Sequence, residues 1–309
     1  MQLCIMNILF TLYPMSIIVL GMVCYIIGYC LIHNIIFVLI CLLSVLRLVS
    51  IKPILQAIDD WIYSTWKEPI DNIRQNIRES FIVQGNLTNS SQAIYILHPH
   101  GIFSLTHIFH AATDITDWPY RNMKGVAHVL LTKIPFLADL LDEDKYVEST
   151  YQQMKGALKE GHSISLCLGN ISEAKYLDDY KITAIVKKRT GIFKMSIETG
   201  IPIIPVLSYG EQSMFKQMYT FGILERLSKL IGMQLPFPNI ESMVEWLSIY
   251  RKPLDKKIYT HIGQPIAVGE PHTPTKDEIN ALRDKYIDAL TELYKETRPA
   301  NYEEMITII

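Results

Sequence analysis

The chain has 309 residues, enough for one large domain or two of medium size. Its 29 Lys and Arg residues nearly balance its 31 Asp and Glu residues, so the charge excludes a polybasic nucleic-acid-binding protein. Of its five cysteines only Cys167 lies beyond the first 50 residues, which excludes a disulfide framework there and favours a reducing compartment.

The N-terminus predicts a membrane anchor. Residues 5–32 form an apolar run of about 28 residues, more than the roughly 20 that a bilayer-spanning helix needs. A shorter apolar run follows at 35–46, and Pro14 would kink the first run, so residues 1–52 are expected to form a membrane-embedded hairpin. The run is too long for a cleaved signal peptide and lacks its basic start. A buried hairpin of a soluble protein is the other alternative.

Flanking charges orient this anchor. Arg47 and Lys52 follow the second apolar run, and cytosolic flanks of membrane segments carry an excess of basic residues. Residues 53–309 are therefore expected to form a cytosol-facing domain.

Residues 53–80 have an amphipathic pattern in which large aromatic side chains stand among charges. The aromatic residues are Trp61, Tyr63 and Trp66. Such a segment fits the lipid headgroup layer, and it fits a helix packed on the domain equally well.

From there, short apolar runs alternate with helical patterns. Strands are expected at 93–97, 125–131, 163–168 and 203–207, with a strand or hairpin at 257–268. Helices are expected at 102–112, from 135 onwards, at 151–160, at 190–199 and, after a capping box at Thr275, through Tyr294. Alternating strands and helices predict an α/β layered domain.

The sequence His98-Pro99-His100-Gly101 directly follows the first of these strands and precedes a helix. In open α/β sheets that end of a strand is where ligands bind. Pro99 fixes its own φ and favours an extended His98, while Gly101 permits a tight bend. Two imidazoles are therefore expected beside the N-terminus of a helix, whose amides could stabilise an oxyanion.

This turn resembles the motif that defines the type-2 diacylglycerol acyltransferase family, which includes monoacylglycerol and wax-alcohol acyltransferases. Further segments resemble other blocks of that family, in the same order: 169–173 its Gly-Gly-x-x-Glu, 189–191 its Arg-x-Gly-Phe, 205–211 its Val-Pro-x-x-x-Phe-Gly-Glu and 263–266 its Gly-x-Pro-Ile. The chain departs from the pattern at Asn170, which replaces the second glycine, and at Ile192, which replaces the phenylalanine.

The resemblance implies a glycerolipid-acyltransferase-like fold and acyl transfer from a thioester to a hydroxyl. His100 is the expected general base, with His98 as second choice. Distant glycerophosphate acyltransferases carry an Asp five residues after their histidine. Neither histidine has that Asp here, so Glu173 is expected to orient an imidazole. The expected substrate-binding residues are Gly101, Arg189, Gly191, Lys194 and Glu211.

The same resemblance implies the partners. Acyl-CoA is the expected co-substrate, and neither a cofactor nor a metal is expected. Lys187, Lys188, Arg189 and Lys194 form a basic cluster that fits the CoA phosphates or, alternatively, is a solvated charge run. The expected acceptor in the bilayer is diacylglycerol, which gives triacylglycerol, or alternatively monoacylglycerol. The endoplasmic reticulum membrane is the expected location, with lipid-droplet contact and a homo-oligomer left open.

Several alternatives stay open. Cys167 could form an acyl-enzyme, although its place in a predicted strand favours a small buried residue. His107 and His110 are interpreted as packing or solvent residues rather than metal ligands. At the level of function, the alternatives are a wax-ester acyltransferase that uses a long-chain alcohol, and a non-catalytic lipid-binding membrane protein.

Overall fold

The structure is a computed structural model, and it describes residues 52–85, 91–111, 118, 122–128, 145–214, 244 and 248–309. Within these residues the chain forms a mixed α/β domain around a seven-stranded sheet, with a separate two-stranded sheet. The strands are β1 (Phe81–Gly85), β2 (Ile94–His98), β3 (Met123–Ala127), β4 (Tyr146–Glu148), β5 (Ser163–Leu166), β6 (Thr183–Ala184), β7 (Ile203–Tyr209), β8 (Ile258–Ile262) and β9 (Thr307–Ile308).

The large sheet has the order β1-β8-β7-β2-β5-β3-β4. All its neighbouring strands pair in parallel except β7 and β8, which are antiparallel. Strand β2 lies between β5 and β7, and every residue of these three strands is buried. This explains the mostly apolar sequences of β2 and β7, because strands covered on both faces have no solvent side to alternate with, whereas β5 buries Ser163 and Ser165 as well.

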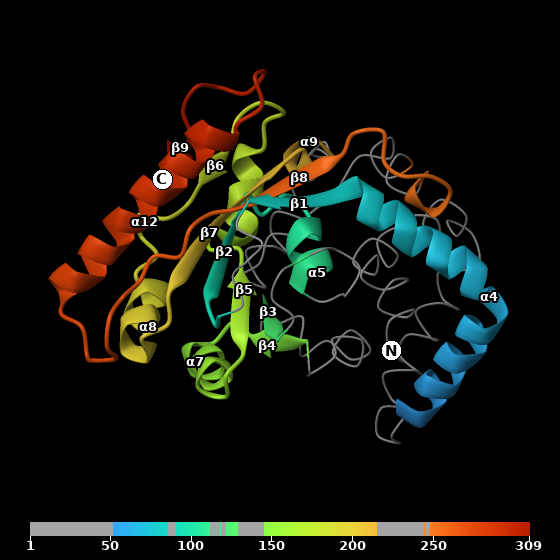
Figure 1. The fold of residues 1–309 in the computed structure, drawn as a ribbon, viewed down its shortest axis with the longest axis horizontal. Helices are drawn as coiled ribbons and strands as arrows, with labels where there is room; N and C mark the ends of the chain where they lie inside the picture. Colours follow the sequence, from blue (N-terminus) through green and yellow to red (C-terminus); the bar gives the residue numbers. More distant parts are fainter. Residues whose placement is uncertain are drawn as a thin grey trace, which may run out of the picture.

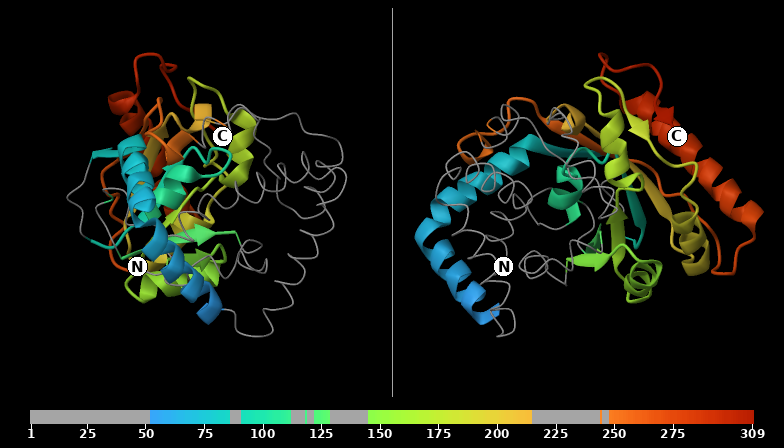
Figure 2. Two further views of the ribbon diagram at one scale, coloured as in Figure 1. Left: turned by 90° about the vertical axis from the view of Figure 1, so that its right-hand side faces the viewer. Right: turned by 180° about the vertical axis from the view of Figure 1, so that it is seen from behind.

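Helices cover both faces of the sheet (Figures 1 and 2). The helical segments are α4 (Lys52–Ser80), α5 (Leu105–Ala111), α7 (Tyr151–Lys159), η1 (Asn170–Tyr176), α8 (Gly191–Thr199), α9 (Glu211–Met214), η2 (Ser248–Tyr250) and α12 (Lys276–Thr297). Helices α7, α8 and α12 share one core cluster with β2, β5 and β7 on one face. Helices α4 and α5 lie on the opposite face, where α5 packs with the end of α4.

Two helix boundaries follow directly from their sequences. Helix α8 ends at Gly200, which adopts a φ of 69°, a left-handed conformation that glycine reaches without strain. Helix α12 begins after Thr275, where the predicted capping box with Glu278 is present, although the helix runs three residues past the predicted end at Tyr294. Its buried face contains Leu282, Tyr286, Leu290, Leu293 and Tyr294.

Several predicted boundaries were wrong. The helix expected at 102–112 begins at Leu105, because residues 101–103 form a turn first. His98 is the last residue of β2 rather than the first residue after it, and it pairs with Leu207 of β7. The strand or hairpin expected at 257–268 is a single strand that ends at Ile262.

The membrane predictions fall mainly outside this structure. The hairpin expected at 1–52 and the helix expected from 135 lie outside the described residues, and the boundary between 52 and 53 stays a prediction. None of the helices in the described part of the chain is both long and apolar enough to cross a bilayer. Residues 53–80 lie within helix α4, and the Trp61 side chain is 64% exposed. The choice between a segment in the lipid headgroup layer and a helix packed on the domain stays open.

Candidate active site

The site lies at one edge of the sheet, where the parallel strands β7, β2 and β5 end. The His98–Gly101 turn follows β2, Glu173 lies in η1 beyond β5, and Glu211 opens α9 directly beyond β7. The carboxyl ends of neighbouring parallel strands meet at the same edge. The fold therefore brings together residues that are up to 113 positions apart in the sequence.

Glu173 holds the turn in place with both of its carboxylate oxygens. Its Oε1 accepts hydrogen bonds from the ring Nδ1 of His98, at 2.8 Å, and from the backbone amide of Ile185, at 2.9 Å. Its Oε2 accepts the backbone amide of His100, at 2.8 Å. Glu173 is 1% exposed, so these donors replace the water that a buried carboxylate would otherwise need. Glu173 thus lies beside the motif, as the sequence predicted, but its ring contact is with His98 and not with His100.

The ring of His100 is oriented by its neighbour. Its Nδ1 lies 3.0 Å from the carbonyl oxygen of Gly101. A carbonyl only accepts hydrogen bonds, so Nδ1 carries the hydrogen and Nε2 presents a lone pair. Burial lowers the pKa of His100 below 6.5, against the raising effects of the Gly101 carbonyl and the Glu173 charge. The neutral imidazole, the form that can accept a proton, is therefore favoured at neutral pH.

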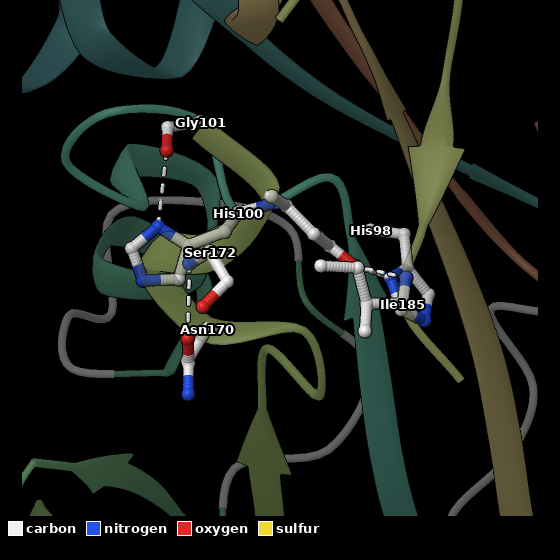
Figure 3. A network of polar contacts seen from close by, with 7 residues as sticks. His98, His100, Gly101, Asn170, Ser172 and Ile185 are labelled. Carbon is white, nitrogen blue, oxygen red and sulfur yellow. Dashed lines mark hydrogen bonds and ion pairs between the residues drawn. The ribbon is translucent and has the colours of Figure 1, made fainter. Parts of the chain in front are cut away.

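The two histidine rings are in different surroundings. Figure 3 shows them pointing away from each other, with the ring of His100 beside Ser172 and that of His98 beside Ile185. His98 is completely buried, whereas His100 is partly exposed. The Nε2 atom of His98 has no hydrogen-bond partner among the described residues. An alcohol can therefore approach His100 but not His98 without moving the core.

The segment that carries Glu173 depends on a close approach at Gly169 and on an unusual backbone conformation at Asn170. A Cβ atom added at Gly169 would lie 2.1 Å from Oε1 of Glu173, so only glycine fits there. Asn170, which replaces the second glycine of the family pattern, has a φ of 47°. Asparagine tolerates this left-handed conformation better than other side chains, and its Oδ1 also accepts the amide of Ser172 at 2.9 Å. The departure at Asn170 therefore preserves the local backbone.

Glu211 supports the opposite side of the turn. Its carboxylate accepts the amides of Leu105, at 2.6 Å, and Thr106, at 3.3 Å, together with the Thr106 hydroxyl. It therefore caps the N-terminus of α5, so two amides of the helix start that was expected to stabilise an oxyanion already have a partner. A Cβ atom on Gly101, whose φ is 64°, would lie 2.7 Å from the same carboxylate. Gly101 and Glu211 thus form part of the support of the turn, and a direct contact of either residue with substrate stays a prediction.

With this geometry, the comparison with known proteins is informative. The family described as diacylglycerol acyltransferase matches residues 71–304, which include the turn, Glu173 and Glu211. The chain belongs to the diacylglycerol acyltransferase family. It is an acyltransferase.

Two relatives with similar sequences have names that agree with this family. The acyltransferase is 25% identical over 267 residues to 2-acylglycerol O-acyltransferase 1 of Bos taurus, covering 76% of this chain and 78% of that protein. It is 26% identical over 228 residues to diacylglycerol O-acyltransferase 2 of Dictyostelium discoideum, covering 70% and 68%. The crystal structure of the 1-acyl-sn-glycerophosphate (LPA) acyltransferase PlsC from Thermotoga maritima aligns with a TM-score of 0.43 and 15% identity, over 96% of this chain and 98% of that chain.

The basic cluster of the acyltransferase divides into two parts. Lys187 and Lys188 are exposed and follow Ile185, whose amide contacts Glu173, and Arg189 is partly exposed. Lys194 instead forms an ion pair with Glu198, at 3.5 Å. Lys194 therefore already has a carboxylate partner. Gly191, the other predicted substrate-binding residue of this segment, is the first residue of α8, and the space around its Cβ position is open.

The remaining candidate residues are His107 and His110, which are buried, and Cys167, which is partly buried. His107 bonds to the Ser165 carbonyl at 2.9 Å, and His110 bonds to Thr260 at 3.0 Å. Burial lowers their pKa values to about 4 and about 3, so both are neutral packing residues. Among the described residues no group of His, Cys, Asp or Glu is arranged to hold a metal ion. Burial raises the pKa of Cys167 well above 9, which disfavours the thiolate that a nucleophile requires.

Some contacts of the site could not be found from residue types. The Ile185 amide is a backbone group, and any residue other than proline would supply it. Gly169 belongs to the block at 169–173 that the family resemblance singled out, although its close approach to the Glu173 carboxylate is visible only in the structure.

Proposed function

We propose that the protein is an acyl-CoA-dependent acylglycerol O-acyltransferase in which His100 is the general base. One observation carries this proposal: the Gly101 carbonyl fixes the His100 ring so that its Nε2 lone pair has no partner among the described residues, on a side chain that is partly exposed. The other histidine of the motif is completely buried. An enzyme that removes a proton from an alcohol needs this tautomer at an accessible position.

In the proposed reaction, Nε2 of His100 takes the hydroxyl proton as the acceptor oxygen attacks the thioester carbonyl. The tetrahedral intermediate then collapses, the carbon–sulfur bond breaks, and the CoA sulfur leaves with the proton from the imidazolium. The amides of Leu105 and Thr106 are bonded to Glu211, so the proposal assigns the oxyanion to the amides of the preceding turn, at Gly101 and Ile102.

Glu173 and His98 are positioning residues in this proposal. Glu173 fixes the backbone amide of His100, and His98 fixes one oxygen of Glu173. The buried His98–Glu173 pair therefore sets where the catalytic ring stands, without touching the substrate. Correct placement of a general base contributes strongly to the rate.

We assign the CoA phosphates to Lys187, Lys188 and Arg189. These residues lie two to four positions after Ile185, so their backbone begins at the site itself. Two of them are exposed, and phosphate oxygens favour such cationic donors. Lys194, which the sequence analysis included, is left out because it is paired with Glu198.

The acceptor and location are also proposals. The names of the relatives, 2-acylglycerol and diacylglycerol O-acyltransferase, favour monoacylglycerol or diacylglycerol as the acceptor. The apolar composition of residues 1–52 and the exposed Trp61 on α4 support a domain held at a membrane. We propose the cytosolic face of the endoplasmic reticulum, with contact to lipid droplets.

An acceptor panel tests the substrate class. Membranes that contain the protein receive labelled acyl-CoA with diacylglycerol, monoacylglycerol or a long-chain alcohol, and membranes with His100→Ala at matched protein level serve as the blank. Product with an acylglycerol is expected. Product with the long-chain alcohol alone would overturn the acceptor assignment, and no product with any acceptor would overturn the enzymatic function and favour a lipid-binding protein.

A further inference from the structure

The last residues of the chain run along the segment that leads to the basic cluster. Strand β9 pairs in parallel with β6, apart from the large sheet (Figure 1). The amide of Thr307 donates to Ile182, at 3.0 Å, and that of Ile309 donates to Ala184, at 2.9 Å. The main-chain oxygen of Ile309 accepts the amide of Val186, at 2.8 Å. The tail therefore holds this segment on both sides of Ile185.

The register of this pairing decides where Ile185 points. Successive residues of an extended chain present their backbone groups to opposite sides. Ile182, Ala184 and Val186 all face the tail, so the intervening Ile185 faces the other way. On that side its amide donates to Oε1 of Glu173. A slip of one residue would turn the Ile185 amide away from Glu173.

The beginning of the same tail is fixed near the second carboxylate. The hydroxyl of Tyr302 accepts the amide of Gly210, at 3.1 Å, and the side-chain amide of Gln212, at 2.7 Å. These two residues flank Glu211, which caps α5 beneath the catalytic turn. Tyr302 is 8% exposed and packs edge-on against Tyr209, so its position is well defined.

We propose that residues 302–309 are a positioning element for acyl transfer, acting through Ile185 and Glu173 on the placement of His100. This inference rests on the proposed function of His100 and adds an element that binds no substrate. It predicts that the tail affects the maximal rate more than the KM for acyl-CoA, because misplacement of a reacting group affects the transition state more than ground-state binding.

Two substitutions at one position isolate the tail's hydrogen bond. Ile309→Pro removes the amide that donates to Ala184, whereas Ile309→Ala keeps it. Both remove the same side chain, which is 37% exposed. In the full-length protein, Ile309→Pro is expected to lower kcat by about tenfold with KM for acyl-CoA within about twofold, and Ile309→Ala to stay near wild type. Equal kcat values for the two variants would overturn the proposal.

A double-mutant cycle separates positioning from general support. If the tail acts through Glu173, Ile309→Pro is expected to lower kcat by less than about twofold in a Glu173→Gln background. An equal loss in both backgrounds would overturn the route through Glu173.

Hydrogen exchange of the Ile185 amide can be measured on an inactive protein. It therefore tests the role of the tail even if the Glu173→Gln enzyme is too slow to assay. Faster exchange is expected in Ile309→Pro than in Ile309→Ala, and identical exchange would overturn the proposal. A wild-type protein without acyltransferase activity would instead overturn the proposed function, while leaving this exchange difference measurable.

Discussion

Replacing Glu173 with Gln tests how the carboxylate positions the His98–Gly101 turn. Glu173 accepts three hydrogen bonds, from the ring of His98 and from the amides of His100 and Ile185. A glutamine oxygen in the place of Oε1 keeps two of these bonds, but its NH₂ group then faces the His100 amide, and two donors cannot bond. The reverse orientation of the amide leaves two donors without an acceptor.

The expected cost follows from this geometry. One buried donor without a partner destabilises a protein by about 1–3 kcal/mol. For a domain of this size that corresponds to a fall in Tm of roughly 2–10 °C. Because the unpaired group is the backbone amide of His100 itself, the acyl-transfer rate is expected to fall by about tenfold to a hundredfold.

The assay compares purified Glu173→Gln with Glu296→Gln, an exposed position on α12, by thermal melting and by transfer from labelled acyl-CoA. The surface variant is expected to match wild type in both measurements. Equal Tm and equal rate for the two variants would refute the role assigned to Glu173.

Three further outcomes are expected. Gly169→Ala puts a Cβ atom 2.1 Å from the Glu173 carboxylate and is expected to lower the acyl-transfer rate about tenfold. Gly156→Ala, at a position with open space around it, is expected to leave the rate at the wild-type value. Equal rates for the two variants would contradict the role of Gly169. Burial raises the pKa of Glu211 to about 7, so the folded protein binds more protons than the unfolded chain between pH 4.5 and 7. Wild type should therefore lose about 3 kcal/mol of stability relative to Glu211→Gln as the pH rises through that range, and a constant difference in unfolding free energy would argue against it. The lowered pKa of His100 predicts that kcat/KM falls on acidification with a midpoint below pH 6.5, and a midpoint above pH 7 is incompatible with this base.

Local signals in the sequence predicted the position of the site well. A buried apolar run followed by His98-Pro99-His100-Gly101 placed the turn at the end of a strand, and β2 confirms the strand. Gly200 and Thr275 marked helix boundaries through their own backbone preferences. These features depend on neighbouring residues alone, which explains why they could be found without a structure.

The interior of the site could not be predicted in the same way. Which ring Glu173 contacts depends on how η1 crosses the end of β2. The sequence left both histidines open, and the structure pairs Glu173 with the ring of His98. The Glu211 cap joins residues about 105 positions apart, and the tail contact uses backbone groups that carry no residue signature. Long-range backbone pairing of this kind leaves little trace in a single sequence.

The central claim, that His100 removes the acceptor's proton, is tested most directly by the kcat of purified His100→Ala with labelled acyl-CoA and a saturating acylglycerol. Loss of a general base lowers the rate by about 10²–10⁴. A fall of that size, with the Tm close to that of wild type, is the predicted result. A kcat within a few-fold of wild type would contradict the account.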